Sequence, residues 1–236
     1  MEAKILSEHY DKENFKTLDG YKQYGGYETL AASLKKQPQE IIDQVKAAGV
    51  RGRGGAGFPA GVKWGFLPKN DEPRYLLCNA DEGEPGTFKD RLMMERAPHQ
   101  LIEGMIISAF AVKSLKSYIY IRGEYAHILK IMEQAIDEAY KAGYLGENIL
   151  GSGFTHHMDV YSGAGAYICG EETALISSLE GEKGQPKLKP PFPAIEGYLH
   201  KPTIVNNVET LAAVVPIMRD GVDAYRKYGT EKSSGT

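Results

Sequence analysis

The chain has 236 residues, of which 42% are hydrophobic and 25% are charged, and its formal net charge is −3. A chain of this length can bury a full core, so we expect one large α/β domain with smaller appendages. Because acidic and basic residues nearly balance, the chain lacks the general basic field typical of nucleic-acid binding proteins.

The sequence shows no pattern of a targeting or membrane-spanning segment. Its N-terminus lacks the charged-then-apolar order of a signal peptide, and the most apolar run, residues 105–112, is too short for a membrane span. Cys78 and Cys169 form no Cys-x-x-Cys pair, which excludes a self-contained four-cysteine iron–sulfur site. We interpret them as two buried thiols in a reducing cytoplasm.

The N-terminal part is expected to form an extension followed by a helix. The first 30 residues are polar and interrupted by three glycines, and Tyr21, Tyr24 and Tyr27 are expected to dock on the main body. Apolar residues at helical spacing predict a helix from about Pro38 to Ala48. Gly49 is placed as its C-terminal stop.

A glycine-rich segment follows at residues 50–64, with five glycines and the cations Arg51, Arg53 and Lys63. Exposed amide groups beside cations suit an anionic ligand such as a phosphate. The spacing Gly52-x-Gly54-x-x-Gly57 matches the dinucleotide fingerprint, but a helix precedes it where that fingerprint requires a strand. A Walker loop is excluded, because no Gly-Lys-Ser/Thr follows.

Strands and helices then alternate, which predicts a Rossmann-like parallel sheet flanked by helices. Polar turns at residues 79–86 and 163–172 follow predicted strands, so both are expected at the ligand-binding rim beyond the carboxyl ends of the strands. The predicted strands are 74–78, 117–122 and 157–161, and the predicted helices are one from Pro98, 126–142, 171–179 and one that starts at Asn206-Asn207 after the Pro-rich stretch 185–202.

The first polar turn carries Asp81, Glu82 and Glu84 in close succession. Three carboxylates repel one another unless donors or cations meet them, and a carboxylate can accept two sugar hydroxyls at once. A Mg²⁺ site and a solvated acidic turn are the alternatives, and the turn by itself does not decide among them.

The second polar turn, residues 163–173, combines small residues with Glu171 and Glu172. Small residues let a flat ligand approach the backbone, whereas two carboxylates in the first turn of a helix also interact favourably with its dipole. The histidines show no metal-ligand spacing, so no metal site is expected. Nucleophilic catalysis has no support in the spacing of serine, histidine and aspartate.

Four ordered motifs, at residues 51–64, 78–86, 163–175 and 206–210, resemble those of a known family. The chain resembles the NADH-binding FMN flavoprotein of respiratory complex I, the bacterial F subunit of NADH–quinone oxidoreductase. Diaphorase subunits of NAD-linked hydrogenases and formate dehydrogenases share the same pattern. The resemblance extends over nearly the whole chain from about residue 20.

The resemblance implies a Rossmann-like domain that binds FMN and NADH together and transfers hydride from nicotinamide to flavin. Lys63, Glu84 and Glu172 are the residues assigned to catalysis, and Lys63 would stabilise negative charge that develops near the flavin. A carboxylate of Glu84 near the adenosine ribose would repel the extra phosphate of NADPH, so NADH should be preferred. The residues implied for FMN are Arg53, Gly54, Lys63, Asn79, Asp81, Glu82, Gly170, Glu171, Asn206, Asn207 and Thr210. Those implied for NADH are Gly55, Phe58, Lys63, Phe66, Glu84, Tyr167, Glu172, Lys189 and Phe192.

The family also suggests the organisation of the chain and its partners. We expect an N-terminal extension and helix over 1–49, the FMN/NADH domain over 50–228, and a linker over 229–236. The family continues into a β-grasp-like domain and a helical domain with a [4Fe-4S] cluster, so the chain is expected to be truncated before them. The implied partners are a thioredoxin-like [2Fe-2S] subunit and other peripheral-arm subunits, on the cytoplasmic side of the bacterial inner membrane.

Two alternatives to an NADH dehydrogenase stay open. The chain is either an NADH dehydrogenase or a flavin-loaded assembly module without turnover, and flavin content with an NADH titration distinguishes them. A Mg²⁺-dependent phosphotransferase that uses Asp81, Glu82 and Glu84 is the weakest reading, because the chain has no phosphate-lysine motif.

Overall fold

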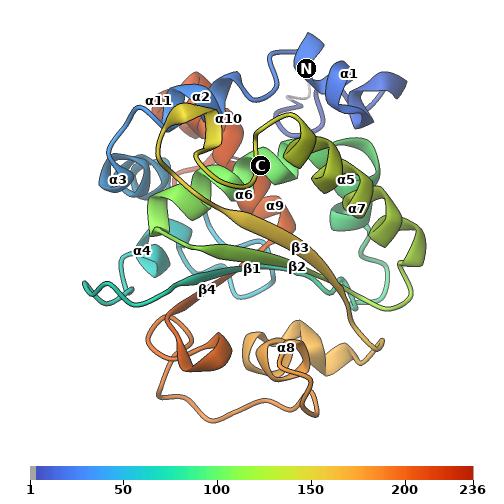
Figure 1. Ribbon diagram of the computed structural model, residues 1–236, viewed down its shortest axis with the longest axis vertical. Helices are drawn as coiled ribbons and strands as arrows, with labels where there is room; N and C mark the ends of the chain where they lie inside the picture. Colours follow the sequence, from blue (N-terminus) through green and yellow to red (C-terminus); the bar gives the residue numbers. More distant parts are fainter. Residues whose placement is uncertain (1–3, 236) are drawn as a thin grey trace.

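A four-stranded parallel sheet forms the centre of the computed structural model, which describes residues 4–235. The strands lie in the order β3-β2-β1-β4, and every neighbouring pair is parallel (Figure 1). Their bounds are β1 Tyr75–Ala80, β2 Lys116–Ile121, β3 His157–Ser162 and β4 Thr203–Asn207. This architecture confirms the predicted α/β class with a Rossmann-like parallel sheet.

Helices cover both faces of this sheet. Figure 1 shows α8 (Glu172–Leu179) on one side and most other helices on the opposite side. The sheet therefore separates a large apolar cluster from a small one that includes Leu77, Val205 and Leu175. The helices of the larger side are α5 Lys89–Arg96, α6 Pro98–Val112, α7 Ala126–Lys141, α9 Val208–Ala212 and α10 Val214–Asp220.

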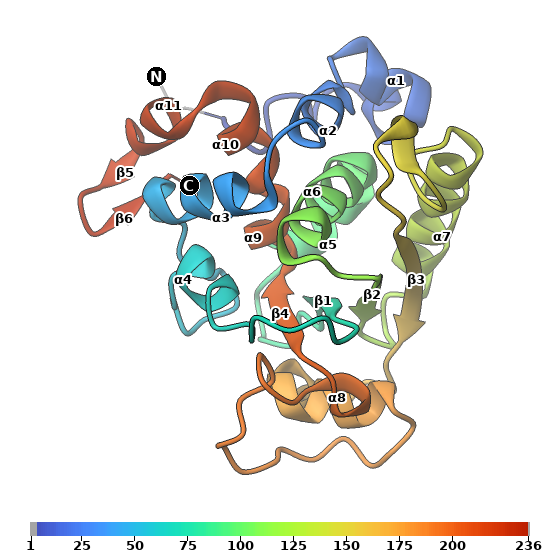
Figure 2. The same cartoon turned by 60° about the vertical axis from the view of Figure 1, so that its left-hand side comes forward.

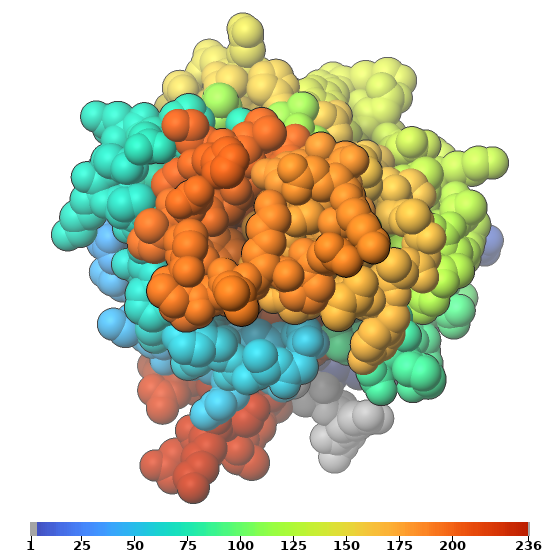
Figure 3. All heavy atoms as spheres, turned by 90° about the horizontal axis from the view of Figure 1, so that it is seen from below, coloured from blue at the N-terminus to red at the C-terminus, as the bar shows by residue number. Residues whose placement is uncertain are grey.

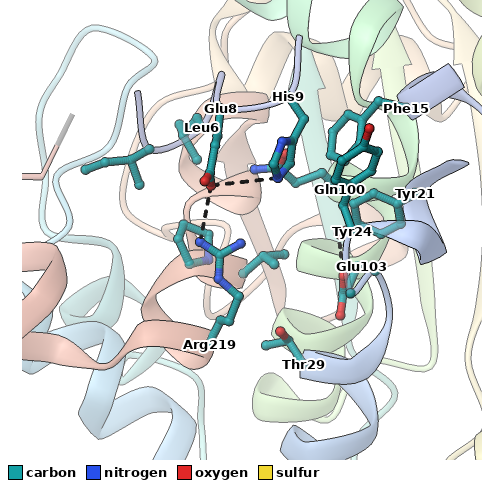
Figure 4. A pocket seen from close by; sticks show the side chains of 15 residues that line it. Leu6, Glu8, His9, Phe15, Tyr21, Tyr24, Thr29, Gln100, Glu103 and Arg219 are labelled. Atoms are coloured by element: carbon teal, nitrogen blue, oxygen red, sulfur yellow. Dashed lines mark hydrogen bonds and ion pairs between the residues drawn. The ribbon is translucent and has the colours of Figure 1, made fainter. Parts of the chain in front are cut away.

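The N-terminal segment folds back onto α6 and contributes to the larger apolar cluster. Tyr21 and Tyr27 are buried, which confirms their expected docking, whereas Tyr24 remains 37% exposed. Figure 4 shows the small cavity of about 20 Å³ left between this segment and α6, with Glu103 on its wall. The elements of this part are η1 Glu13–Lys16, α1 Leu18–Gln23, α2 Glu28–Ser33 and α3 Pro38–Ala48.

Short elements complete the described chain (Figure 2). The hairpin of β5 and β6 lies beside α3, and the Ser234 hydroxyl donates a hydrogen bond of 2.6 Å to the Ala48 carbonyl. These elements are α4 Ala60–Trp64, η2 Ile149–Gly151, η3 Tyr167–Gly170, η4 Tyr198–His200, α11 Val222–Arg226, β5 Gly229–Thr230 and β6 Ser233–Ser234.

The main error of the sequence analysis is strand β4. Asn206 and Asn207 were expected to start a helix, but they end β4, which pairs with β1. Pairing with β1 determines that residues 203–207 form a strand. The five residues after the proline are too few for their local sequence to predict a strand. The helix that follows is also interrupted, since α9 ends at Ala212 and α10 begins at Val214.

The other predicted elements agree with the structure to within one or two residues. Glu171 caps α8, which begins at Glu172, and does not lie in its first turn. The proposed boundaries after residues 49 and 228 stay a prediction, although one apolar cluster contains Leu6, Ile41 and Tyr225. Among residues 4–235, no helix is long and apolar enough to cross a membrane.

Candidate functional site

A cavity of about 590 Å³ lies at the carboxyl ends of β1 and β4. Its size is within the usual range for small-molecule and cofactor sites. Both polar turns contribute to it, which confirms their expected place at the rim of the sheet. The lining residues are Arg53, Gly54, Gly55, Asn79, Asp81, Glu82, Gly83, Glu84, Thr87, Lys89, Asp90, Tyr167, Ile168, Gly170, Glu171 and Asn207.

The glycine-rich loop forms one wall of the cavity. The Gly52 amide donates to the Phe58 carbonyl over 2.8 Å and closes the loop. Gly55 has a φ of 111°, a conformation that L side chains rarely adopt, and a side chain added there would meet no atom within 4 Å. Arg51 does not line the cavity, because its guanidinium donates to the Gly57 and Lys232 carbonyls. The residues of this loop that line the cavity are Arg53, Gly54 and Gly55.

Asp81 supplies an unpaired acceptor atom to the lining of the cavity. Its Oδ2 atom is buried and has no hydrogen-bond partner among residues 4–235. Burial raises the pKa of Asp81 to about 6; Arg122 opposes this shift and Glu124 adds to it. Asn79 shapes this part of the lining by accepting from the Asp81 amide over 3.1 Å and donating to the Gly170 carbonyl over 2.8 Å. A ligand hydroxyl would give Asp81 its missing donor.

Glu82 has a different task from its neighbour. Its two carboxylate oxygens accept the Asp90 and Arg91 amides at 2.8 and 3.0 Å and so cap helix α5. Burial raises its pKa, while these two amide hydrogen bonds oppose the shift. The Glu82 side chain is therefore engaged within the protein.

At the mouth of the cavity, the Tyr167 hydroxyl donates to a Glu84 oxygen over 2.7 Å. This hydrogen bond raises the pKa of Tyr167. Tyr167 is 64% exposed, so its ring is accessible from solvent.

A network of alternating charges adjoins the cavity through Glu171. Lys63 Nζ lies 2.7 Å from Glu172 Oε2, and Lys189 Nζ lies 2.9 Å from a carboxylate oxygen of both Glu171 and Glu172. Burial by itself would raise the pKa of Glu172, but the charge and hydrogen bond of Lys63 hold it below its ordinary value. The network links helix α4, helix α8 and the loop that carries Lys189. This loop lies on the face of the molecule shown in Figure 3.

The remaining predicted site residues surround the lining. Thr210 Oγ1 accepts the Arg53 amide over 2.9 Å, and Asn206 Oδ1 accepts the Trp64 indole over 2.8 Å, so both support the walls from behind. Three predicted aromatics lie on the surface outside the lining, namely Phe58, Phe66 and Phe192, at 46%, 53% and 56% exposure. Phe58 and Phe66 form a pair with ring centroids 5.8 Å apart.

Five lining residues were missed by the sequence analysis: Gly83, Thr87, Lys89, Asp90 and Ile168. Lys89 and Asp90 follow the acidic turn within a few residues, and a cation so close to three carboxylates was the available signal. Gly83 and Ile168 lie inside motifs that the sequence analysis had already singled out.

Comparison with known proteins identifies the family of the chain. Residues 45–216 match the family model described as the Nuo51 FMN-binding domain. The chain is 52% identical over 234 residues to the F subunit of NADH-quinone oxidoreductase of Streptomyces coelicolor, covering 99% of this chain and 52% of that protein. It is 54% identical over 222 residues to the corresponding F subunit of Escherichia coli, covering 93% of this chain and 50% of that protein.

A solved structure is also similar. The NAD+-reducing [NiFe]-hydrogenase in its H2-reduced state aligns with a TM-score of 0.81 and 41% identity, over 99% of this chain and 38% of the hydrogenase chain. The chain spans about half the length of the curated relatives it matches. These matches confirm the resemblance that the four motifs carry.

Proposed function

The chain belongs to the family of Nuo51 FMN-binding domains, and from this premise we propose that it binds FMN and NADH as the electron-input unit of an NADH–quinone oxidoreductase of the complex I type. The observation that carries the proposal is the unpaired Asp81 carboxylate in a cavity bounded by glycine backbone. It offers an acceptor for sugar-alcohol hydroxyls, while Gly54, Gly55 and Gly170 leave room for a flat ring system.

The residues present fit a flavin mononucleotide. The predicted FMN residues that line the cavity are Arg53, Gly54, Asn79, Asp81, Glu82, Gly170, Glu171 and Asn207. Other predicted FMN residues act through them: Thr210 fixes the Arg53 backbone, and Asn206 fixes Trp64. When bound, FMN supplies the acceptor for the hydride that NADH gives up.

The protein's contribution to this reaction is orientation and electrostatics. Lys63 donates to Glu172 and to the Val205 carbonyl, so its charge is held at the end of β4. We assign Lys63 to stabilising negative charge near the flavin, and Glu84, Glu172 and Lys189 to binding NADH. The exposed aromatics Phe58, Phe66, Tyr167 and Phe192 supply apolar surface for its adenine and nicotinamide rings.

A spectroscopic experiment tests the proposal. Protein loaded with FMN and kept without oxygen should lose its flavin absorbance near about 450 nm when NADH is added. Dithionite, a chemical reductant, is the control that shows the bound flavin to be reducible. Bound flavin that dithionite bleaches and NADH does not would leave only the assembly-module reading. Failure to bind FMN at all would contradict the site itself.

A diaphorase function is the second candidate, because the similar hydrogenase structure is described as NAD+-reducing. The two candidates share the NADH half-reaction and differ in the electron acceptor. The named relatives at 50% to 54% identity are subunits of NADH-quinone oxidoreductase, which favours the first. We propose a peripheral place on the cytoplasmic side of a bacterial inner membrane, next to a thioredoxin-like [2Fe-2S] subunit.

A further inference from the structure

We propose that Thr173 is a positioning residue for the dinucleotide, because its hydroxyl ties the loop that carries Lys189 and Phe192 to the start of helix α8. The inference rests on the proposed function, in which Lys189 and Phe192 bind NADH. It adds a residue that lies outside the lining of the cavity and acts through this loop.

The loop over residues 181–197 is long and has few supports. It contains no helix or strand, and Leu188 is 94% exposed. Figure 3 shows the loop in orange on the surface of the molecule. Among the described residues, the amide of Lys187 is the only main-chain group of residues 186–191 that forms a hydrogen bond. A loop of this length without secondary structure is usually functional or disordered, so its few anchors decide where Lys189 and Phe192 lie.

The partner of the Lys187 amide is the Thr173 hydroxyl. The amide donates to Thr173 Oγ1 over 2.8 Å, and the same hydroxyl donates to Glu171 Oε2. A hydroxyl has one hydrogen and two lone pairs, so it can serve both partners at once. Thr173 is only 6% exposed, so water cannot readily take the place of either partner.

The other partner of Thr173 is a carboxylate that lines the cavity. Glu171 Oε2 also accepts the amides of Thr173 and Ala174, at 2.8 and 3.0 Å, and thus caps α8. Burial by itself would raise the pKa of Glu171, but the hydrogen bonds from Thr173 and Lys189 hold it below its ordinary value. The ionised carboxylate can only accept, which makes the Thr173 hydroxyl the donor. Thr173 therefore connects a predicted FMN residue with the loop that carries predicted NADH residues.

Lys189 makes the second contact between this loop and α8. Its Nζ atom lies 2.9 Å from a carboxylate oxygen of both Glu171 and Glu172. Without the Thr173 hydrogen bond, this long side chain would hold residues 186–191 alone, and its many rotamers would let the main chain shift. We expect such a shift to displace Phe192 and weaken NADH binding, without slowing hydride transfer once NADH is bound.

Digestion with trypsin tests the tether without flavin or NADH. Thr173→Val keeps the branched shape of the side chain but removes the hydroxyl, so cleavage after Lys187 should become at least about threefold faster than in the wild-type protein. The fragments are identified by mass spectrometry. Thr173→Ser keeps the hydroxyl and should restore the slow cleavage. Thr155→Val is the matched control, because the Thr155 hydroxyl also accepts a loop amide, that of Asn148, and it should leave this rate unchanged.

The NADH concentration dependence of flavin reduction measures the effect on the dinucleotide. In FMN-loaded protein without oxygen, Thr173→Val should raise the half-saturating NADH concentration by about 3- to 10-fold, the range of one hydrogen bond. The limiting rate of reduction should stay within about twofold and the affinity for FMN within about threefold. Thr173→Ser should restore the wild-type concentration, and Thr155→Val should not alter it.

A second variant keeps the inference testable if Thr173→Val does not fold. Lys187→Pro removes the amide hydrogen and leaves α8 unchanged. Lys187→Ala is its control, because it removes only the side chain, whose ammonium lies 3.6 Å from both Glu180 and Glu182. The half-saturating NADH concentration should rise by about 3- to 10-fold with proline and stay within about twofold with alanine. Equal effects of the two variants, whether both large or both absent, would overturn the inference.

Three further results would also overturn it, for distinguishable reasons. Unchanged NADH saturation in Thr173→Val, with or without faster cleavage, would leave Thr173 a purely structural residue. Equal weakening of FMN and NADH binding would mean that Thr173 supports Glu171 and the cavity as a whole. Wild-type protein that binds FMN and is not reduced by NADH would contradict the proposed function and this inference with it, while the trypsin digestion would still report on the tether.

Discussion

Asp81 and Glu82 are adjacent carboxylates after β1, and the folded chain gives them different surroundings. Asp81 faces the cavity with a buried oxygen that lacks a donor, while both Glu82 oxygens accept amides of α5. An unpaired buried acceptor destabilises the folded state, whereas a helix cap stabilises it. Asp81 therefore has the character of a ligand-binding residue, and Glu82 that of a structural one.

The pKa of Asp81 gives a prediction for stability against pH. Because its folded-state value is about 6 and its ordinary value 3.8, the folded protein binds this proton more tightly than the unfolded chain. The contribution of Asp81 to stability is therefore lost as pH rises from about 4 to about 6. Asp81→Asn should raise the free energy of unfolding of the flavin-free protein by about 1–2 kcal/mol at about pH 7.5. This gain is smaller than the pKa shift by itself implies, because solvent screens the partly buried carboxylate.

Urea denaturation at about pH 4 and about pH 7.5 measures this effect, with Asp71→Asn at an exposed position as the control. The gain from Asp81→Asn should nearly vanish at the lower pH, where the native carboxyl is already protonated. A gain of equal size at both pH values would mean that burial of charge is not its cause.

At the scale of elements, two helices receive their N-terminal caps from glutamates that lie outside them. The N-cap residues of α2 and α5 are Tyr27 and Phe88, and neither provides a side-chain cap. Glu103 on α6 accepts the Tyr27 and Leu30 amides at 3.0 and 2.8 Å, and Glu82 serves α5 in the same way. Glu103 thereby joins the N-terminal segment to α6, whereas Glu82 joins the turn after β1 to the helix that follows it.

Glu103→Gln tests this role for the N-terminal segment. Glu103 is fully buried and also accepts a hydrogen bond from the Tyr21 hydroxyl, so an amide there would oppose one of these donors. We expect the free energy of unfolding to fall by about 2 kcal/mol or more. Glu133→Gln on the exposed face of α7 is the matched control. A loss below about 0.5 kcal/mol for Glu103→Gln would rule out the cap as a main anchor.

At the scale of the whole molecule, the N-terminal segment and the helices above the sheet share one core. Phe15 and Leu30 belong to the same apolar cluster as Trp64 on α4 and Ile204 on β4. Elements that share a core in this way usually unfold together. We therefore expect the cavity to belong to a cooperative unit that includes residues 4–48.

Two probes of thermal unfolding can test this cooperativity. Trp64 is the sole tryptophan, is 1% exposed and hydrogen-bonds to Asn206 beside the cavity, so its fluorescence reports on the site. Far-UV circular dichroism reports on all helices, including α1–α3. The two transitions should coincide, and saturating FMN should raise both midpoints by the same amount. An earlier transition seen by circular dichroism alone would support a separate N-terminal unit that ends near residue 49.

The sequence by itself determined the family, the α/β class and most of the elements. The helices that begin at Pro38 and Pro98 and the strands around Cys78, Ile119 and Val160 were predictable, because proline, glycine and apolar runs are local signals. Both polar turns were likewise predictable as rim segments, since each directly follows a strand.

Only the tertiary structure decided what depends on distant partners. Thr203–Asn207 is a strand because β1 pairs with it, and Arg51 lies outside the lining of the cavity because its guanidinium donates to the Gly57 and Lys232 carbonyls. Lys89 and Asp90 enter the lining of the cavity beside Asn207 because the end of β4 contacts the start of α5. The pairing of β1 with β4 and the contacts of Lys89 and Asp90 with Asn207 join residues more than 100 positions apart, and no local pattern in the sequence encodes such a meeting.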